Sequence, residues 1–387
     1  MNEDEPFFIC SDCAKDIYLK NYILTNSNIQ AICTICLKDK LCVDITNDNK
    51  ITEFCRFLIR YHFPEYVYNS HWGGDVIEKI LFDENPIITH NFAERPERDI
   101  IQEQFIMDLF DIWNDKSKIE LYYGHDESGR GFFPRAIKDE KSIVWEKYKK
   151  DIQSTNFFLL EAKAKETISK ILTDLKFTLN KNNCYFRARI GFNEIEKKIE
   201  INTVKIKVPF KDDEISAPPI FKAKAGRANR HGLSFLYLSS DSETSFSEVR
   251  PHPGHYVSIG EFICINDLLL ADLRFIDLIK YYESEDNLQI FQLLQDLANE
   301  LSTPILPEEQ EKYLVTQFIS DIIRQLDFDG ILFNSSVSNG HNLVIFNPNN
   351  FIFKKDSSKL IKIAEIEFKY KNVEYSIDNF FERAIEK

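Results

Sequence analysis

Two cysteine pairs near the start of the chain limit what this sequence can fold into more than any other feature. Each pair has the spacing Cys-x-x-Cys, the first being Cys10 and Cys13 and the second Cys33 and Cys36. Two thiolates three positions apart can bind one ion from a tight turn, and a second such turn completes a tetrahedral set of sulfur ligands. The spacing therefore predicts a zinc ribbon over residues 1–45 that holds a structural Zn²⁺. Because sulfur fills all four positions, this metal is not expected to take part in catalysis.

The composition restricts where such a chain can work and what it can bind. Eight cysteines in 387 residues are too few for a disulfide scaffold, and the first residues lack the basic start and apolar run of a secretory signal. No run of about 18 apolar residues is present, which argues against a transmembrane helix. The net charge of −14 argues against a nucleic acid or an anionic membrane surface as partner. We therefore expect a cytoplasmic protein without a membrane partner.

After the ribbon the residue pattern becomes helical. Apolar residues recur at spacings of three and four in residues 46–180, for example at Ile101, Phe105 and Leu109. This pattern predicts a mostly helical accessory domain. A run of asparagine and lysine at residues 180–183 marks its end.

The pattern then changes to one that is typical of strands. Residues 184–190 alternate with period two, which places Phe186 and Arg187 on opposite faces of a predicted strand. We expect a catalytic domain over residues 181–365 and a C-terminal tail over residues 366–387. The expected fold class for the whole chain is α+β.

The distribution of glycines indicates which part of the chain could form a functional site. Four of the 12 glycines lie within residues 226–260, and glycine allows sharp turns and the close approach of a ligand. The same window contains Arg227, Asn229, Tyr237 and Glu248. Arginine suits a pyrophosphate, tyrosine offers a flat face to an aromatic ring, and a glutamate can stabilise positive charge on a ribose. These groups fit a dinucleotide ligand, and the sequence has no Gly-x-Gly-x-x-Gly turn that would indicate hydride transfer.

In this order the segments resemble the RES domain, a family named after an arginine, a glutamate and a serine. The resemblance covers about residues 184–350. The matching segments are Tyr185–Arg187, Gly226–Asn229, Leu236–Ser239, Ser247–Pro251, Phe328–Ser335 and Asn342–Phe346. The resemblance implies a mixed β core like that of ADP-ribosyltransferases. The preceding helical region has a weaker resemblance to HEPN domains.

RES domains are known as toxins that destroy NAD. The resemblance therefore implies an enzyme that cleaves the bond between nicotinamide and ribose, with NAD as its substrate. The acceptor stays open: water for an NAD glycohydrolase, inorganic phosphate for an NAD phosphorylase, or a macromolecule for an ADP-ribosyltransferase. A role in toxin–antitoxin pairs or phage defence is implied as well, with an antitoxin or a trigger-sensing protein as partner.

The resemblance also implies which residues bind NAD. Arg187 and Arg227 would bind the pyrophosphate or orient the ligand, and Asn229 belongs to the same binding set. Arg189 points to the same side of the predicted strand as Arg187. The preference for Arg187 therefore rests on the resemblance alone.

Three further residues would lie at the reacting bond. Tyr237 would pack beside the nicotinamide, and Glu248 would hold the nicotinamide ribose and stabilise its positive charge as the bond breaks. Ser335 would donate a hydrogen bond at the nicotinamide end. Ser336 is the alternative if the register is shifted by one residue.

Other interpretations stay open. Ser245 and Glu248 have the spacing of a capping box at a helix start, and Tyr237 could belong to an apolar core. Arg56 and His62 are spaced like the catalytic pair of HEPN ribonucleases. The ribbon could recognise nucleic acid, although the acidic charge of the chain weighs against this function.

Overall fold

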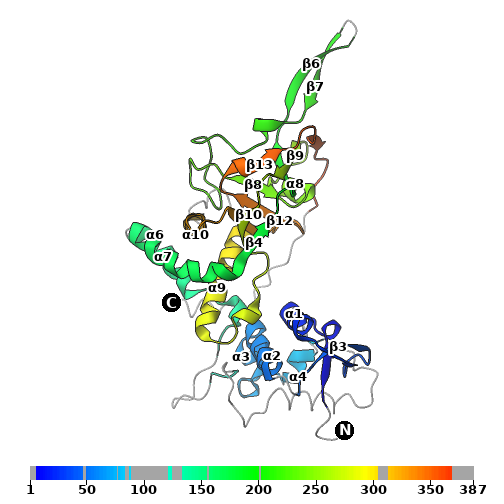
Figure 1. Ribbon diagram of the computed structural model, residues 1–387, viewed down its shortest axis with the longest axis vertical. Coiled ribbons are helices and arrows are strands. Elements are labelled where there is room, and N and C mark those ends of the chain that lie inside the picture. Colours follow the sequence, from blue (N-terminus) through cyan, green and yellow to red (C-terminus); the bar gives the residue numbers. More distant parts are fainter. Residues whose placement is uncertain are drawn as a thin grey trace. The chain divides into compact units, whose positions relative to one another are not determined.

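The chain is a mixture of helices and strands (Figure 1). It forms two compact units. The computed structural model describes residues 6–46, 49–75, 77–82, 87–88, 121–123, 133–154, 157–199, 202–303 and 313–367. The first unit consists of Met1–Phe177, Ala225–Arg230 and Leu269–Asn334. The second unit consists of Thr178–Lys224, His231–Leu268 and Ser335–Lys387.

These units follow the chain differently from the domains expected from the sequence. The first continuous segment of the first unit ends at residue 177, close to the expected boundary at 180. Two later segments of the chain also belong to this unit. The expected domains 1–45, 46–180, 181–365 and 366–387 therefore stay predictions. The helix expected around Ile101–Leu109 and the tail beyond residue 367 lie outside the described residues.

The N-terminal part of the first unit is a small antiparallel sheet with one helix. Strand β3 (Asp39–Asp44) lies between β1 (Phe8–Cys10) and β2 (Ile29–Ile32). Helix α1 (Ile17–Asn26) is inserted between β1 and β2. It begins after Asp16, whose carboxylate accepts a hydrogen bond from a backbone N–H of the first turn. The two Cys-x-x-Cys turns are thus separated by a helix in sequence, while their strands both neighbour β3.

The rest of the described first unit is mainly helical. Its helices are α2 (Asn49–His62), α3 (Glu65–Tyr68), α4 (Ile77–Phe82), α6 (Ile143–Ser154), α7 (Phe157–Ile171), α9 (Glu285–Ser302) and α10 (Leu314–Gln325). Helices α9 and α10 pack against β11 (Gly330–Asn334), which pairs in parallel with β10 (Leu268–Asp272). Strand β4 (Lys176–Leu179) runs from the first unit into the second. Among the described residues, no helix combines the length and the apolar character needed to cross a membrane.

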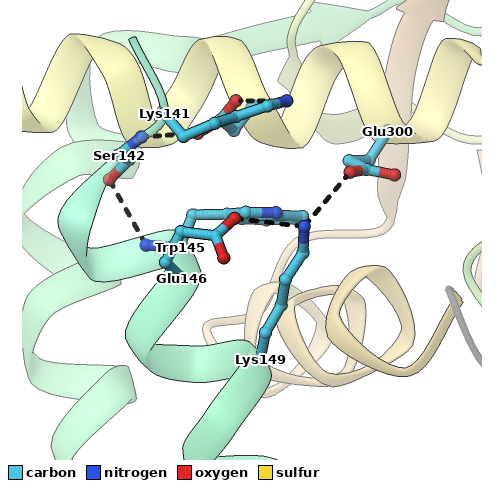
Figure 2. Close-up of polar contacts among 7 residues, drawn as sticks. Lys141, Ser142, Trp145, Glu146, Lys149 and Glu300 are labelled. Atoms are coloured by element: carbon cyan, nitrogen blue, oxygen red, sulfur yellow. Dashed lines mark hydrogen bonds and ion pairs between the residues drawn. The ribbon is translucent and has the colours of Figure 1, made fainter. Parts of the chain in front are cut away.

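Polar contacts fix helix α6 against helix α9 in the first unit. The buried carboxylate of Asp296 accepts a hydrogen bond of 2.8 Å from the backbone N–H of Ser142, the residue before α6. The side chain of Trp145 is fully buried one turn later. Figure 2 shows Lys149 between Glu146 of its own helix and Glu300 of α9, at distances of 3.2 and 3.8 Å. Burial of an aromatic ring, with paired charges around it, sets the register of the two helices.

The second unit is built on an antiparallel sheet. Its strands lie in the order β13-β9-β5-β8-β12, and β14 also pairs with β9. Their bounds are β5 (Cys184–Ile190), β8 (Leu236–Ser239), β9 (Tyr256–Cys264), β12 (His341–Ile345), β13 (Phe351–Phe353) and β14 (Lys359–Lys362). A hairpin of β6 (Asn193–Ile199) and β7 (Asn202–Val208) projects from this sheet (Figure 1). The strand expected at residues 184–190 is thus confirmed, and together with the parallel pair β10–β11 the chain contains both kinds of strand pairing.

One face of this sheet carries a short helix, α8 (Ser242–Glu248). Phe246 and Val249 pack against buried side chains of β5 and β9, namely Ala188, Val257 and Ile259. Side chains alternate along a strand, so Arg187 lies on the opposite face from Ala188 and α8. The apolar contacts of α8 therefore decide which residues of the sheet share a face with Glu248.

The start of α8 differs from the capping box that the sequence suggested. The helix begins after Asp241, whose Oδ1 accepts a hydrogen bond of 2.7 Å from the backbone N–H of Thr244. Ser245 lies inside the helix, where its hydroxyl donates to the carbonyl of Ser242. Glu248 is the last residue of α8. The capping-box interpretation of Ser245 and Glu248 is therefore wrong, and the side chain of Glu248 is available for another role.

Asp241 is expected to stabilise the second unit through its cap. Burial acts to raise the pKa of Asp241, but hydrogen bonds from Thr244 and Ser240 outweigh it and hold the pKa below its ordinary value. We expect Asp241→Ala to lower the free energy of unfolding by about 1–2 kcal/mol at pH 7, with a smaller loss for Asp241→Asn. Since a lowered pKa stabilises the fold above the ordinary carboxyl pKa, the difference between wild type and Asp241→Asn should start to shrink as the pH falls below about 4 and continue to shrink through the lower pKa of the folded state. Thermal unfolding across pH measures both effects, and equal melting temperatures for all three proteins at pH 7 would contradict the assignment.

Candidate active site and cysteine cluster

The carboxylate of Glu248 is the centre of a polar cluster in the second unit. Its Oε1 atom accepts a hydrogen bond of 2.8 Å from the hydroxyl of Ser335. The same oxygen accepts a second bond, of 2.6 Å, from Nδ2 of Asn342. Hydrogen bonds to a charged acceptor are stronger than bonds between neutral groups. The two donors therefore hold the carboxylate in one orientation at the end of α8.

The position of Asn342 follows from the pairing of two strands. In the antiparallel ladder of β8 and β12, Asn342 lies directly opposite Ser239, so the two side chains share a face of the sheet. The hydroxyl of Ser239 donates to Oδ1 of Asn342 at 2.9 Å, and both residues are buried. Because Oδ1 accepts this bond, the donor atom Nδ2 is turned toward Glu248. Asn342 lies within a segment that resembles the RES domain, but it is not among the site residues expected from the sequence.

The loop before β12 is bound to the start of α8. The hydroxyl oxygen of Ser338 lies 2.5 Å from that of Thr244. A Cβ atom added at Gly340 would overlap side-chain oxygens of Thr244, Asp241 and Ser240. Only glycine permits this close approach. The loop thus contacts the first turn of α8, and its residue Ser335 contacts the last.

Tyr237 and Arg187 are in contact but lie on different faces of the sheet. Tyr237 precedes Ser239 by two residues on β8, so its half-buried side chain is on the face that carries α8. From the opposite face, Nη1 of Arg187 donates a hydrogen bond of 2.8 Å to the backbone carbonyl of Tyr237. Burial, together with the positive charge of Arg189, lowers the pKa of Arg187 to about 10. Its Nε atom is buried and has no hydrogen-bond partner among the described residues.

Arg227 and Asn229 belong to the first unit, and their described contacts lie within it. Nη1 of Arg227 donates to the backbone carbonyls of Leu301 and Ser302, at 2.8 and 3.2 Å, where α9 ends. A positive charge is favourable at the C-terminal end of a helix. Asn229 is buried, and its backbone carbonyl accepts a hydrogen bond of 2.9 Å from the backbone N–H of Gly226. The structure gives these residues anchoring contacts, and their expected contact with a pyrophosphate stays a prediction.

The four cysteines of the Cys-x-x-Cys pairs form one cluster in the first unit. Their sulfur atoms all lie within 4.8 Å of one another, and three of the four residues are buried. The distances Cys10–Cys13, Cys10–Cys36 and Cys13–Cys33 are each 3.7 Å. A tetrahedral ion with bonds of about 2.3 Å to sulfur separates its ligands by about 3.8 Å. The cluster therefore fits a metal ion with four sulfur ligands.

The ionisation of these thiols also depends on the cluster. Burial, followed by the charge of Cys33, raises the pKa of Cys10 to about 11. The hydrogen bond with Cys33, followed by burial, raises the pKa of Cys13 as well. Only Cys33 is shifted the other way, since the bond from Cys13 lowers its pKa to about 4. Metal binding would have to displace the protons that the raised pKa values retain on Cys10 and Cys13.

His62, part of the alternative ribonuclease pair, has a structural contact. Its Nε2 atom lies 2.8 Å from Oδ2 of Asp16, the residue that caps α1. Arg56 lies on the same helix, α2, with its Nε atom buried. The His62 contact connects α1 with α2 and does not by itself indicate catalysis.

Comparisons with known proteins identify a family over part of the chain. Residues 206–366 match the RES domain family. This match confirms the resemblance in that range, which contains Arg227, Asn229, Tyr237, Glu248 and Ser335 and begins after Arg187. No curated protein matches the chain. The solved structure titled "Crystal structure of the M.tuberculosis MbcT-MbcA toxin-antitoxin complex" is similar at 10% identity and a TM-score of 0.28, over 50% of this chain and 91% of that one.

The contacts of Gly340 can be tested directly. We expect Gly340→Ala to destabilise the protein by about 1–3 kcal/mol, because the new methyl group must displace the loop or the cap of α8. Gly232→Ala is the contrast, since its φ of 86° is strained for alanine but no atom lies within 4 Å of the added Cβ. It should cost only about 1–2 kcal/mol. Thermal unfolding measures both, and a Gly340→Ala protein as stable as wild type would show that the loop does not approach α8 this closely.

Proposed function

We propose that the chain is an NAD-consuming enzyme that cleaves the bond between nicotinamide and ribose. The observation that carries this proposal is the carboxylate of Glu248, held by Ser335 and Asn342 within the segment that matches the RES domain. The resemblance to the RES domain implies that Glu248 and Ser335 both lie at the reacting bond. Their direct contact supports a shared role in one site.

A single carboxylate is sufficient for this reaction. The leaving nicotinamide carries a positive charge before the bond breaks, so it needs little help from an acid. As the bond lengthens, positive charge spreads into the ribose, and a fixed carboxylate stabilises that charge more in the transition state than in the ground state. Glu248 performs this step. Tyr237, on the same face of the sheet, packs beside the nicotinamide in this proposal.

The acceptor of the ADP-ribose group defines the product. Transfer to water gives ADP-ribose, transfer to inorganic phosphate gives a phosphorylated ADP-ribose, and transfer to a macromolecule gives a modified product. Chromatography of the products from NAD, with and without added phosphate, separates these outcomes. On the basis of the family resemblance, we propose that the chain is an NAD glycohydrolase or an NAD phosphorylase. The same resemblance supports a role in a toxin–antitoxin pair or in phage defence, with an antitoxin or a trigger-sensing protein as partner.

Arg227, Asn229 and Arg187 have different roles in this proposal. Arg227 and Asn229 lie inside the matched segment, which supports their assignment to the pyrophosphate end of NAD. Arg187 lies outside it and on the face opposite Glu248, where it contacts the carbonyl of Tyr237. We therefore propose that Arg187 contributes to the site at least by holding the backbone of Tyr237.

The central test is to remove the negative charge of Glu248. We expect Glu248→Gln to lower the rate of nicotinamide release from NAD by at least about 100-fold, because the amide keeps the size of the side chain but loses its charge. The matched control is Glu243→Gln, which changes an exposed glutamate of the same helix and should keep the wild-type rate. Release of nicotinamide is followed by chromatography, and circular dichroism checks that both variants are folded. Undiminished NAD loss in Glu248→Gln, or no NAD loss in the wild type, would remove the assignment.

We also propose that the cysteine cluster binds a structural Zn²⁺. Four sulfur ligands leave no position for a substrate, so the ion would stabilise the fold of residues 1–45 and supply no catalytic chemistry. The sulfur distances support this assignment. Cys10, Cys13, Cys33 and Cys36 would each donate one thiolate.

Metal analysis tests this proposal. We expect about one zinc per chain in the purified protein, and loss of that zinc in Cys33→Ser because a hydroxyl is a poor zinc ligand. Cys184→Ser, at an exposed cysteine of the second unit, is the control and should keep the metal. Removal of zinc by a chelator should unfold the N-terminal sheet and leave nicotinamide release largely intact. Equal zinc content in the two variants would contradict the four-cysteine site.

A further inference from the structure

We propose that Asn342 is a positioning residue that sets the orientation of Glu248 for the reaction. This inference rests on the proposed cleavage of NAD and adds a residue that the sequence analysis did not assign to the site. Asn342 is 6% exposed, whereas Ser335 is half-buried. A residue so buried is poorly placed to contact a substrate. Its effect on the reaction must therefore pass through Glu248.

An amide side chain at position 342 costs free energy unless it is hydrogen-bonded. Asn342 is followed on β12 by three buried apolar residues, Leu343, Val344 and Ile345. Burial of an amide is unfavourable unless both its donor and its acceptor are hydrogen-bonded. The backbone pairing of β8 with β12 does not need an amide side chain. The amide is stable here because Ser239 and Glu248 satisfy its two ends.

The hydrogen bond with Ser239 sets the direction in which the amide of Asn342 points. The hydroxyl of Ser239 donates to Oδ1 of Asn342 across the strand pair, which leaves Nδ2 as the atom nearest Glu248. The amide can therefore act only as a donor toward the carboxylate. Ser335 donates to the same oxygen from the more exposed side. Together they restrict the rotation of a side chain that would otherwise be mobile at a helix end.

The two donors to Glu248 also differ in how rigidly the backbone holds them. Asn342 lies on β12, where it forms the first pair of the ladder with β8, whereas Ser335 lies on the loop before this strand. A group that must be held to a fraction of an ångström is better placed from a strand than from a loop. We infer that Asn342 sets the orientation of Glu248 and that Ser335 completes it.

Two substitutions at this position separate positioning from packing. Asn342→Asp keeps the size of the side chain and the acceptor for Ser239, but it replaces the donor with an oxygen that faces the Glu248 carboxylate. Asn342→Ala removes the whole amide and leaves space. If the residue matters only for packing, kcat falls in proportion to the melting temperature in both variants, because a buried carboxylate beside Glu248 destabilises the fold in any case. If it positions Glu248, the aspartate variant is the more damaging one, since two carboxylates repel each other.

The experiment measures steady-state NAD cleavage, NAD affinity by calorimetry and melting temperature for the full chain. Assays run at about pH 8.5, well above the ordinary pKa of a carboxyl group. We expect kcat to fall by about 10- to 100-fold in Asn342→Asp and less in Asn342→Ala, while the affinity for NAD changes by no more than about 3-fold. Ser239→Ala, which frees the amide to turn over, should show an intermediate loss of kcat. Asn347→Asp, at an exposed asparagine just after β12, is the matched control and should behave as wild type.

The outcomes distinguish this inference from the function on which it rests. An active wild type with Asn342→Asp at least as active as Asn342→Ala would overturn the positioning role and leave the proposed function standing. A loss of kcat that runs parallel to a loss of melting temperature in all three site variants would also overturn it, because packing alone explains that result. An inactive wild type would remove both the function and the inference.

Discussion

The pairing of β8 with β12 is the constraint on which the candidate active site depends. It places Ser239 opposite Asn342, and that pair determines which atom of the amide meets Glu248. A slip of one residue would turn Asn342 to the other face of the sheet and bring His341 or Leu343 to its place. The carboxylate would then lose a buried donor without any change in sequence. The register of β8 and β12 therefore determines the orientation of the Glu248 carboxylate, and helix α8 alone does not.

Helix α8 connects this register to the rest of the second unit. A helix of this length is not stable by itself, so its position comes from tertiary contacts at three points. Asp241 caps its start, Phe246 and Val249 bury its apolar side on β5 and β9, and Glu248 is bound at its end. The loop before β12 contacts both ends through Gly340 and Ser335. Displacement of the loop would therefore alter the cap and the carboxylate together.

How much of this the sequence predicts depends on the range of the interaction. The cysteine cluster was predictable because each Cys-x-x-Cys turn is local and four thiols leave few alternatives. Glu248 and Ser335 were selected by resemblance, and the strand at residues 184–190 by its alternation. The register that joins Asn342 to Ser239 spans about a hundred residues, and no local pattern encodes it. The face covered by α8 is likewise a tertiary outcome, which is why the separation of Arg187 from Glu248 did not follow from the alternation alone.

Arg187 shows how the two faces of the sheet are coupled. A buried guanidinium whose pKa is lowered to about 10 still carries its charge near neutral pH, so the fold retains a cation at some cost. Its described acceptor is the carbonyl of Tyr237, reached from behind β8. On the other face, α8 packs on the neighbouring residue Ala188 and ends in Glu248. Strand β5 therefore fixes the backbone of Tyr237 with one side chain and supports the helix that carries Glu248 with the next, so that a single strand sets the positions of both groups.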